Sequence, residues 1–127
     1  MFEIQTFGGC GCENTGSKLI FSCSGCADVG ELSDQSARKL SREGIGKMSC
    51  LAGVGGGMSG FIKSAETAAK VLAIDGCQLH CSKKTLEKAG VSSVAHLCLE
   101  DIGFIKGQTE VSDENISTVT RQATILL

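Results

Sequence analysis

The sequence predicts a single α/β domain in which helices cover both faces of a mainly parallel sheet of about four strands. Short apolar segments alternate with longer segments of helical periodicity, the order expected for strands joined by right-handed helical crossovers. Cys23, Cys50 and Cys77 each follow an apolar segment and are equally spaced along the chain, one strand–helix unit apart. A length of 127 residues suits one such domain.

The individual elements follow from local patterns. Asp28, with Glu31 three residues later, predicts a capping box at the start of the first helix, and Ser112 predicts the N-cap of the last helix. Gly44 and Gly90 follow helical segments and predict helix ends. Residues 1–17 form a Cys- and Gly-containing lead-in with a short strand at 3–7, and residues 18–127 form the domain. We expect strands at 18–22, 45–49, 71–74 and 93–99, helices at 28–44, 61–69, 81–89 and 110–127, and a glycine-rich loop at 51–60.

Composition and charge narrow the functional classes. The net charge is −2, the isoelectric point is near 5.6 and all aromatic residues are Phe, so nothing favours binding to nucleic acid. No apolar run approaches the roughly 20 residues of a membrane span. Residues 1–5 lack the basic and apolar regions of a signal peptide. We therefore expect a cytoplasmic protein without nucleic-acid or membrane partners, and leave a protein partner or homo-oligomer open.

Eight cysteines are the most unusual feature of the composition. Because disulfides are rare in reducing compartments, metal binding or redox chemistry is the expected use of these thiols. Cys98 lies within an apolar run and is expected to be a buried small hydrophobe. Cys10 and Cys12, between glycines in the lead-in, are either additional metal ligands or exposed thiols.

The remaining thiols are predicted to share one edge of the sheet. In a parallel sheet all carboxyl ends lie on the same edge, where ligands bind near a switch in strand order. Cys23, Cys50 and Cys77 each end a strand, and Cys81 opens the helix that follows the third. A helix N-terminus favours an anion such as a thiolate. The sequence therefore predicts a thiol site at this edge.

Several ordered blocks of the sequence carry a family resemblance. They are Cys23-Ser24-Gly25, Asp28-Val29-Gly30, residues 47–53, Ile74-Asp75-Gly76-Cys77, Cys81 and residues 83–87. The chain resembles the DGC domain, a family of small zinc-binding proteins named for its Asp-Gly-Cys motif. The resemblance implies a zinc site at Cys23, Cys50, Cys77 and Cys81, and it implies no particular reaction. The chain differs from the family pattern at Cys26, where a small residue such as Ala is expected.

The identity of the metal and the presence of catalysis stay open. Four thiolates suit a structural zinc site, but they also suit an iron–sulfur cluster or copper(I). Asp75 and His80 are candidate neighbours of the ligands or alternative ligands, although His80 is more simply an exposed loop residue, and His96 is expected to be structural. A site closed by four cysteines indicates a structural or sensing role, whereas water at one position would permit hydrolysis or lyase chemistry.

Thiol redox chemistry is the alternative function. Cys23-Ser24-Gly25-Cys26 is a C-x-x-C pair between a strand and a helix, the place where such pairs are reactive. The chain contains no proline, whereas thioredoxin-like proteins set a cis-proline opposite the pair.

A dinucleotide site is a weaker alternative. Residues 55–60 satisfy G-x-G-x-x-G, and Asp75 follows Gly55 at the usual interval of about twenty residues. However, Gly55 lies well beyond the expected strand end, and we expect no room in 127 residues for the second, substrate-binding domain that usually accompanies such a site. We expect this segment to be a flexible lid over the cysteine edge. Arg38, Lys39, Lys83 and Lys84 are expected to be exposed helix charges.

Overall fold

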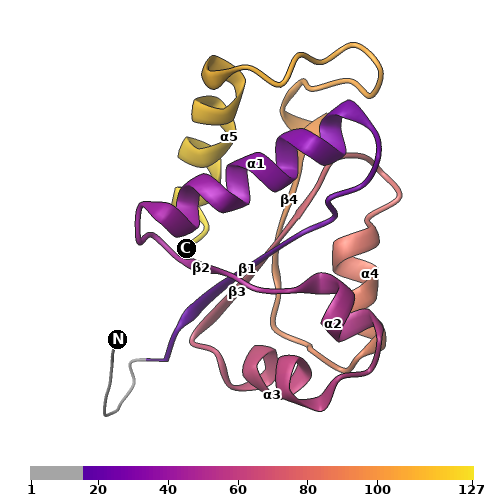
Figure 1. Ribbon diagram of the computed structural model, residues 1–127, viewed down its shortest axis with the longest axis vertical. Coiled ribbons are helices and arrows are strands. Elements are labelled where there is room, and N and C mark those ends of the chain that lie inside the picture. The colour runs from indigo at the N-terminus through magenta and orange to yellow at the C-terminus, as the bar shows by residue number, and fades with distance from the viewer. Residues whose placement is uncertain (1–15) are drawn as a thin grey trace.

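In the computed structural model, which describes residues 16–127, four parallel strands form one sheet in the order β2–β1–β3–β4 (Figure 1). The predicted α/β class and parallel sheet are confirmed, whereas the expected strand at 3–7 and Cys10 and Cys12 lie outside the described residues. No helix in the described part is long and apolar enough to cross a membrane. The elements are β1 (Lys18–Ser22), α1 (Asp28–Arg42), β2 (Lys47–Met48), α2 (Leu51–Gly55), α3 (Ser59–Thr67), β3 (Lys70–Asp75), α4 (Cys81–Lys88), β4 (Ala95–Cys98), the 3₁₀ helix η1 (Leu99–Ile102) and α5 (Asp113–Ile125).

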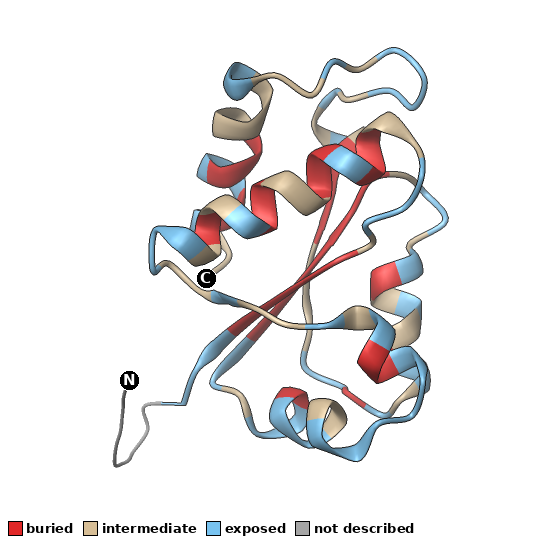
Figure 2. Ribbon diagram, in the orientation of Figure 1, coloured by how far each residue is buried: buried red, intermediate tan, exposed pale blue. Residues whose placement is uncertain are grey.

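Helices cover both faces of the sheet and form three layers. Figure 1 shows α1 and α5 on one side and α2, α3 and α4 on the other. Alternate residues of β1 face opposite layers: Ile20 packs with Leu32 and Val119, whereas Phe21 packs with Val54 and Leu86. The buried residues in Figure 2 accordingly concentrate along the strands and on the inward sides of the helices. The central strands are apolar on both faces, as a parallel sheet between helices requires.

The strand order places a topological switch beside β1. The chain leaves β1 through α1 to reach β2 on one side, and returns past β1 to β3 on the other. Ligands of open α/β sheets bind at the carboxyl ends of the strands where the order reverses in this way. Here the reversal lies between the ends of β1 and β3, which are followed by Cys23 and by Gly76-Cys77.

The glycine-rich segment differs from the prediction. Residues 51–60 were expected to form a loop, but Leu51–Gly55 is helix α2 and the next helix begins at Ser59. Tertiary packing outweighs the low helix propensity of glycine: Val54 is buried in the core, and a Cβ on Gly53 would lie 2.5 Å from the ring of Phe61. The expected flexible lid is therefore largely a packed helix.

Two strands are shorter than predicted. The segment 45–49 contributes only Lys47–Met48, because within residues 16–127 β2 is an edge strand that pairs only with Leu19 and Ile20 of β1. The segment 93–99 contributes Ala95–Cys98, after which the chain tightens into η1.

The helix boundaries are mostly as predicted, with one correction. Ser112 caps α5 by accepting a hydrogen bond from the amide of Asn115, and Gly90 follows α4 with a φ of +91°. The residue at the N-cap of α1 is Ala27, so Asp28 is the first helical residue rather than the cap. The Asp28 carboxylate turns instead toward a distant loop and accepts hydrogen bonds from the amides of Gly107 and Thr109 at 2.9 Å.

Candidate functional site

Cys23 lies at the centre of the carboxyl edge, directly after β1. Its backbone amide donates to the carbonyl of Ile74, which extends the pairing of β1 with β3. Its half-buried Sγ accepts a hydrogen bond from the amide of Gly76 at 3.4 Å and lies 3.2 Å from the hydroxyl of Ser33. That hydroxyl donates to the carbonyl of Gly30. The thiol is thus fixed between the start of α1 and the turn after β3.

Asp75 ends β3 and orients the helix that follows. Its buried carboxylate accepts hydrogen bonds from the amides of Ser82 at 2.7 Å and Lys83 at 3.1 Å, which are in the first turn of α4. Its second oxygen also lies 2.9 Å from Nε2 of His96 on β4. Asp75 therefore satisfies amides at the helix N-terminus and joins β4 to α4. These bonds support a structural role for His96, and they hold the Asp75 carboxylate against the two residues that follow Cys81.

Cys77 and Cys81 lie at the two ends of the turn between β3 and α4. Cys77 is half-buried, whereas Cys81 is exposed as the first residue of α4. Between them His80 adopts a left-handed conformation with φ +55° and its amide donates to the carbonyl of Cys77. The His80 ring is half-buried rather than exposed, because it packs edge-on against the ring of His96 at a centroid distance of 4.7 Å.

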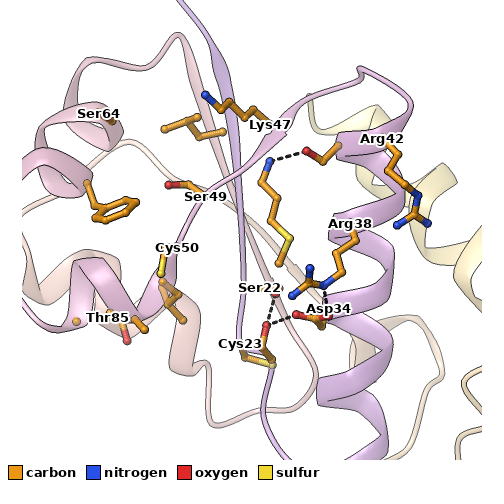
Figure 3. Close-up of a pocket in the computed structure, with 18 residues that line it drawn as sticks. Ser22, Cys23, Asp34, Arg38, Arg42, Lys47, Ser49, Cys50, Ser64 and Thr85 are labelled. Atoms are coloured by element: carbon orange, nitrogen blue, oxygen red, sulfur yellow. Dashed lines mark hydrogen bonds and ion pairs between the residues drawn. The ribbon is translucent and has the colours of Figure 1, made fainter. Parts of the chain in front are cut away.

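Cys50 is exposed at the start of α2. Its Sγ accepts a hydrogen bond from the amide of Gly53 at 3.3 Å, so the thiol takes the place of a Ser or Asp side chain at the N-cap. Cys50 and Cys23 line the same cleft, which has a volume of about 1070 Å³ and opens between α1 and the connection from β2 to α2 (Figure 3). Cys77 and Cys81 are not among the residues that line it.

A loop that carries Lys106 adds a cation to the cysteine edge. Interaction with Cys77 raises the pKa of Lys106, and Glu100 and Cys26 add smaller electrostatic contributions in the same direction. Asp28 holds the loop through Gly107 and Thr109, and these amide hydrogen bonds lower the pKa of Asp28. Sequence reasoning missed Lys106 because no local motif links it to cysteines so distant in the sequence.

The candidate thiols are neighbours in pairs, but they do not surround one point. Cys50 and Cys23 share the cleft, Cys23 contacts the residue before Cys77, and one turn separates Cys77 from Cys81. Among residues 16–127, no three Cys, His, Asp or Glu side chains are placed to hold one metal ion. All described cysteines are free thiols. Cys98 is buried as predicted, and burial raises the pKa of its thiol.

The sequence was compared with known protein families and proteins. A model of the DGC domain matches residues 19–123. The chain is also 40% identical over 88 residues to the anaerobic and virulence modulator AnvM of Pseudomonas aeruginosa, an alignment covering 69% of this chain and 67% of that protein. No solved structure is significantly similar to the sequence. The family match includes every described candidate thiol, and the chain belongs to the DGC domain family.

Proposed function

We propose that the protein binds zinc through Cys23, Cys50, Cys77 and Cys81 and acts as a metal-dependent structural or sensing module. The observation that carries this proposal is the placement of all four thiols at the carboxyl edge of one parallel sheet, on segments that follow β1, β2 and β3. Three independent strand–helix connections would not each need a thiol at this edge for packing alone. Four thiolates are a common donor set for zinc.

The exposure of the thiols supports a binding role rather than a role in the core. Cys50 and Cys81 are exposed, and Cys23 and Cys77 are half-buried, so all four can be reached by an ion from solvent. Cys98 provides the contrast, since it is 3% exposed and packs as an apolar residue.

Binding of one ion by all four thiols requires their side chains and loops to move toward one another, because the described side chains do not converge. The required movement is favoured where the segments are short and exposed. Helix α2 has only five residues and is followed by Gly56 and by Gly57, whose φ is +77°. Metal sites of this kind commonly form together with local structure. We therefore expect zinc binding to shift the segments that carry Cys50 and Cys81 toward Cys23 and Cys77.

Single cysteine variants test the proposal. Anaerobically purified protein, stripped of metal, is titrated with zinc against a chromogenic chelator. Cys23→Ser, Cys50→Ser, Cys77→Ser and Cys81→Ser should each weaken zinc binding by more than about 100-fold, because even residues beyond the ligands commonly contribute 10–100-fold. Cys26→Ser is the matched control and should bind zinc as the wild type does. The proposal is wrong if none of the four variants differs from Cys26→Ser.

The C-x-x-C pair supports thiol redox chemistry as a second candidate. Cys26 is exposed and Cys23, three residues before it, is half-buried, which suits an attacking thiol beside a resolving thiol. In this reaction the Cys26 thiolate attacks a substrate disulfide, forms a mixed disulfide and releases one substrate thiol. Cys23 then attacks the Cys26 sulfur and releases the second substrate thiol, which leaves a Cys23–Cys26 disulfide. This candidate predicts that Cys26→Ser abolishes reduction of a small disulfide while zinc binding is retained.

A further inference from the structure

The cleft between α1 and the β2–α2 connection has features that the cysteines do not explain. Its volume of about 1070 Å³ is sufficient for a small molecule. Helix α1 contributes Arg38 and Arg42 to its lining, and β2 contributes Lys47. Asp34 is the only acidic residue in the described lining, so the cleft carries an excess of positive charge. Such a field attracts anions.

An ion pair with Asp34 orients the exposed side chain of Arg38 at the edge of this cleft. Its Nε donates to Oδ2 of Asp34 at 2.7 Å, and Oδ1 of the same carboxylate accepts a hydrogen bond from Ser24 at 2.7 Å. The Ser24 hydroxyl lies 2.6 Å from the hydroxyl of Ser22, which is buried. A chain of hydrogen bonds thus connects the end of β1 to the guanidinium. Although partial burial opposes it, the hydrogen bonds from Arg38 and Ser24 lower the pKa of Asp34, so the pair stays ionised.

The contact with Asp34 involves only Nε of the Arg38 guanidinium. The two terminal amino groups of Arg38 have no acceptor among residues 16–127, and Figure 3 shows the group directed from α1 toward the cleft. These amino groups supply paired N–H donors whose geometry matches the two oxygens of a carboxylate or phosphate. A guanidinium whose Nε is oriented by a carboxylate can therefore bind an oxyanion through the N–H groups of its terminal nitrogens.

The remaining walls suit a small organic body. Lys47 provides a second cation, and no carboxylate pairs with it within the described part of the chain. The half-buried side chains of Phe61 and Leu51 add apolar surface, and Ser49 adds a hydroxyl. The pattern of a cationic end and an apolar wall favours a molecule with one charged terminus over a bare ion.

We propose that this cleft binds a small organic anion, with its carboxylate or phosphate group held by Arg38 and its charge further neutralised by Lys47. The bound molecule would lie beside Cys23 and Cys50, the two thiols that line the cleft. The inference rests on the cleft and its cations, and it does not depend on zinc binding.

Titration of isotope-labelled protein followed by NMR tests the proposal, at constant ionic strength and without zinc. Butyrate and butyl phosphate, each with one charged terminus and an apolar tail, are the two anionic probes, and butyramide is the neutral control. We expect at least one anion to shift the amide signals of Ser24 and Ser49 in a saturable manner, and butyramide to leave them unchanged. The probe that binds more tightly identifies the carboxylate or the phosphate as the recognised group.

Charge-removing variants decide whether Arg38 is responsible. Arg38→Gln should raise the dissociation constant about tenfold or more, because it removes charge-assisted hydrogen bonds, and Lys47→Gln should raise it by a smaller factor. Arg121→Gln, an exposed variant on α5 outside the cleft, is the matched control and should leave binding unchanged. Loss of an exposed i,i+4 ion pair is nearly neutral for folding, so Arg38→Gln should remain folded. The proposal is overturned if neither anion saturates, or if Arg38→Gln binds as Arg121→Gln does.

Discussion

The backbone amide of Gly76 donates a hydrogen bond to Sγ of Cys23 across 3.4 Å, and this contact joins the end of β1 to the turn after β3. It lies at the switch in strand order, where α/β folds place their ligand sites. The three residues of the Asp-Gly-Cys motif have separate tasks there: Asp75 satisfies the first turn of α4, Gly76 lets the turn approach α1, and Cys77 presents a thiol.

The approach of Gly76 to α1 predicts a strong effect of a single methyl group. A Cβ at this position would lie 2.7 Å from the carbonyl carbon of Val29 and 2.8 Å from its oxygen, so the backbone must shift. We expect Gly76→Ala to lower the free energy of unfolding by about 1–3 kcal/mol, the usual cost of overpacking. Chemical denaturation measures this change.

Gly60→Ala is the matched control for that variant. Gly60 lies in α3 and a Cβ there would meet nothing within 4 Å. The alanine should stabilise the protein by about 0.5–1 kcal/mol, because it reduces the freedom of the unfolded chain. If both variants have the same stability, the close packing of Gly76 against Val29 does not constrain the turn.

Asp75 should be important for stability in addition to its place beside the thiols. Asp75→Ala removes the acceptor of two amides of α4 and of the His96 ring, and leaves these buried and half-buried donors without their partner. We expect a loss of about 2–4 kcal/mol, given that a lost buried partner costs about 1–3 kcal/mol and several donors are affected. Thermal and chemical denaturation check this value. Glu66→Ala, on the exposed side of α3, should differ little from the wild type, and an equal loss in both variants would contradict the proposed network.

Asp28 should make the attachment of the Lys106 loop depend on pH. The amides of Gly107 and Thr109 lower the pKa of Asp28 in the folded protein below its ordinary value of 3.8. When folding lowers the pKa of a carboxyl, the charged carboxylate stabilises the protein at any pH above the pKa of the unfolded state. This stabilisation is lost as the pH falls through the lower pKa of the folded state. The attachment should thus be complete at neutral pH and be lost below about pH 3.8.

Hydrogen exchange reports this attachment directly. At neutral pH, Asp28→Ala should accelerate exchange at the amides of Gly107 and Thr109, while amides of β3 keep their protection. In the wild type, the protection of the same two amides should decline as the pH falls below 3.8, after correction for the intrinsic exchange rate. Unchanged protection in Asp28→Ala would show that other contacts hold the loop.

Cys98 should behave differently from the thiols at the sheet edge. It is 3% exposed and burial raises the pKa of its thiol, so little thiolate is present at neutral pH and access is blocked. Alkylation of native protein with iodoacetamide, followed by peptide mapping, should label Cys26, Cys50 and Cys81 first and Cys98 only after unfolding. Early labelling of Cys98 would mean that β4 opens readily.

The sequence was sufficient to predict the fold class and the edge at which the thiols gather. Both follow from short-range signals: the apolar strand 71–74 ends in the Asp75-Gly76 turn, and the equal spacing of Cys23, Cys50 and Cys77 matches the strand–helix repeat. The helix ends at Gly90 and Ser112 were predictable for the same reason, because caps depend on nearby residues.

Features that depend on distant residues could not be predicted. Helix α2 forms in a glycine-rich segment because Val54 enters the core and Phe61 packs on Gly53, contacts that composition does not reveal. Arg38 is an exposed helix charge, as expected, but its pair with Asp34 and the cleft beside it were not predicted. The approach of Lys106 to Cys77 likewise arises only in the folded chain.

The most direct test of the proposed zinc site is the metal content of protein purified without exposure to oxygen, together with a count of reactive thiols before and after chelation. If the four edge cysteines bind zinc, the protein should contain about one zinc per chain, and about four additional thiols should become reactive when a chelator removes the zinc. Iron with sulfide would retain the thiol site but replace zinc by a cluster. Metal-free protein whose edge thiols all react before chelation would contradict the account and favour the redox function of Cys23 and Cys26.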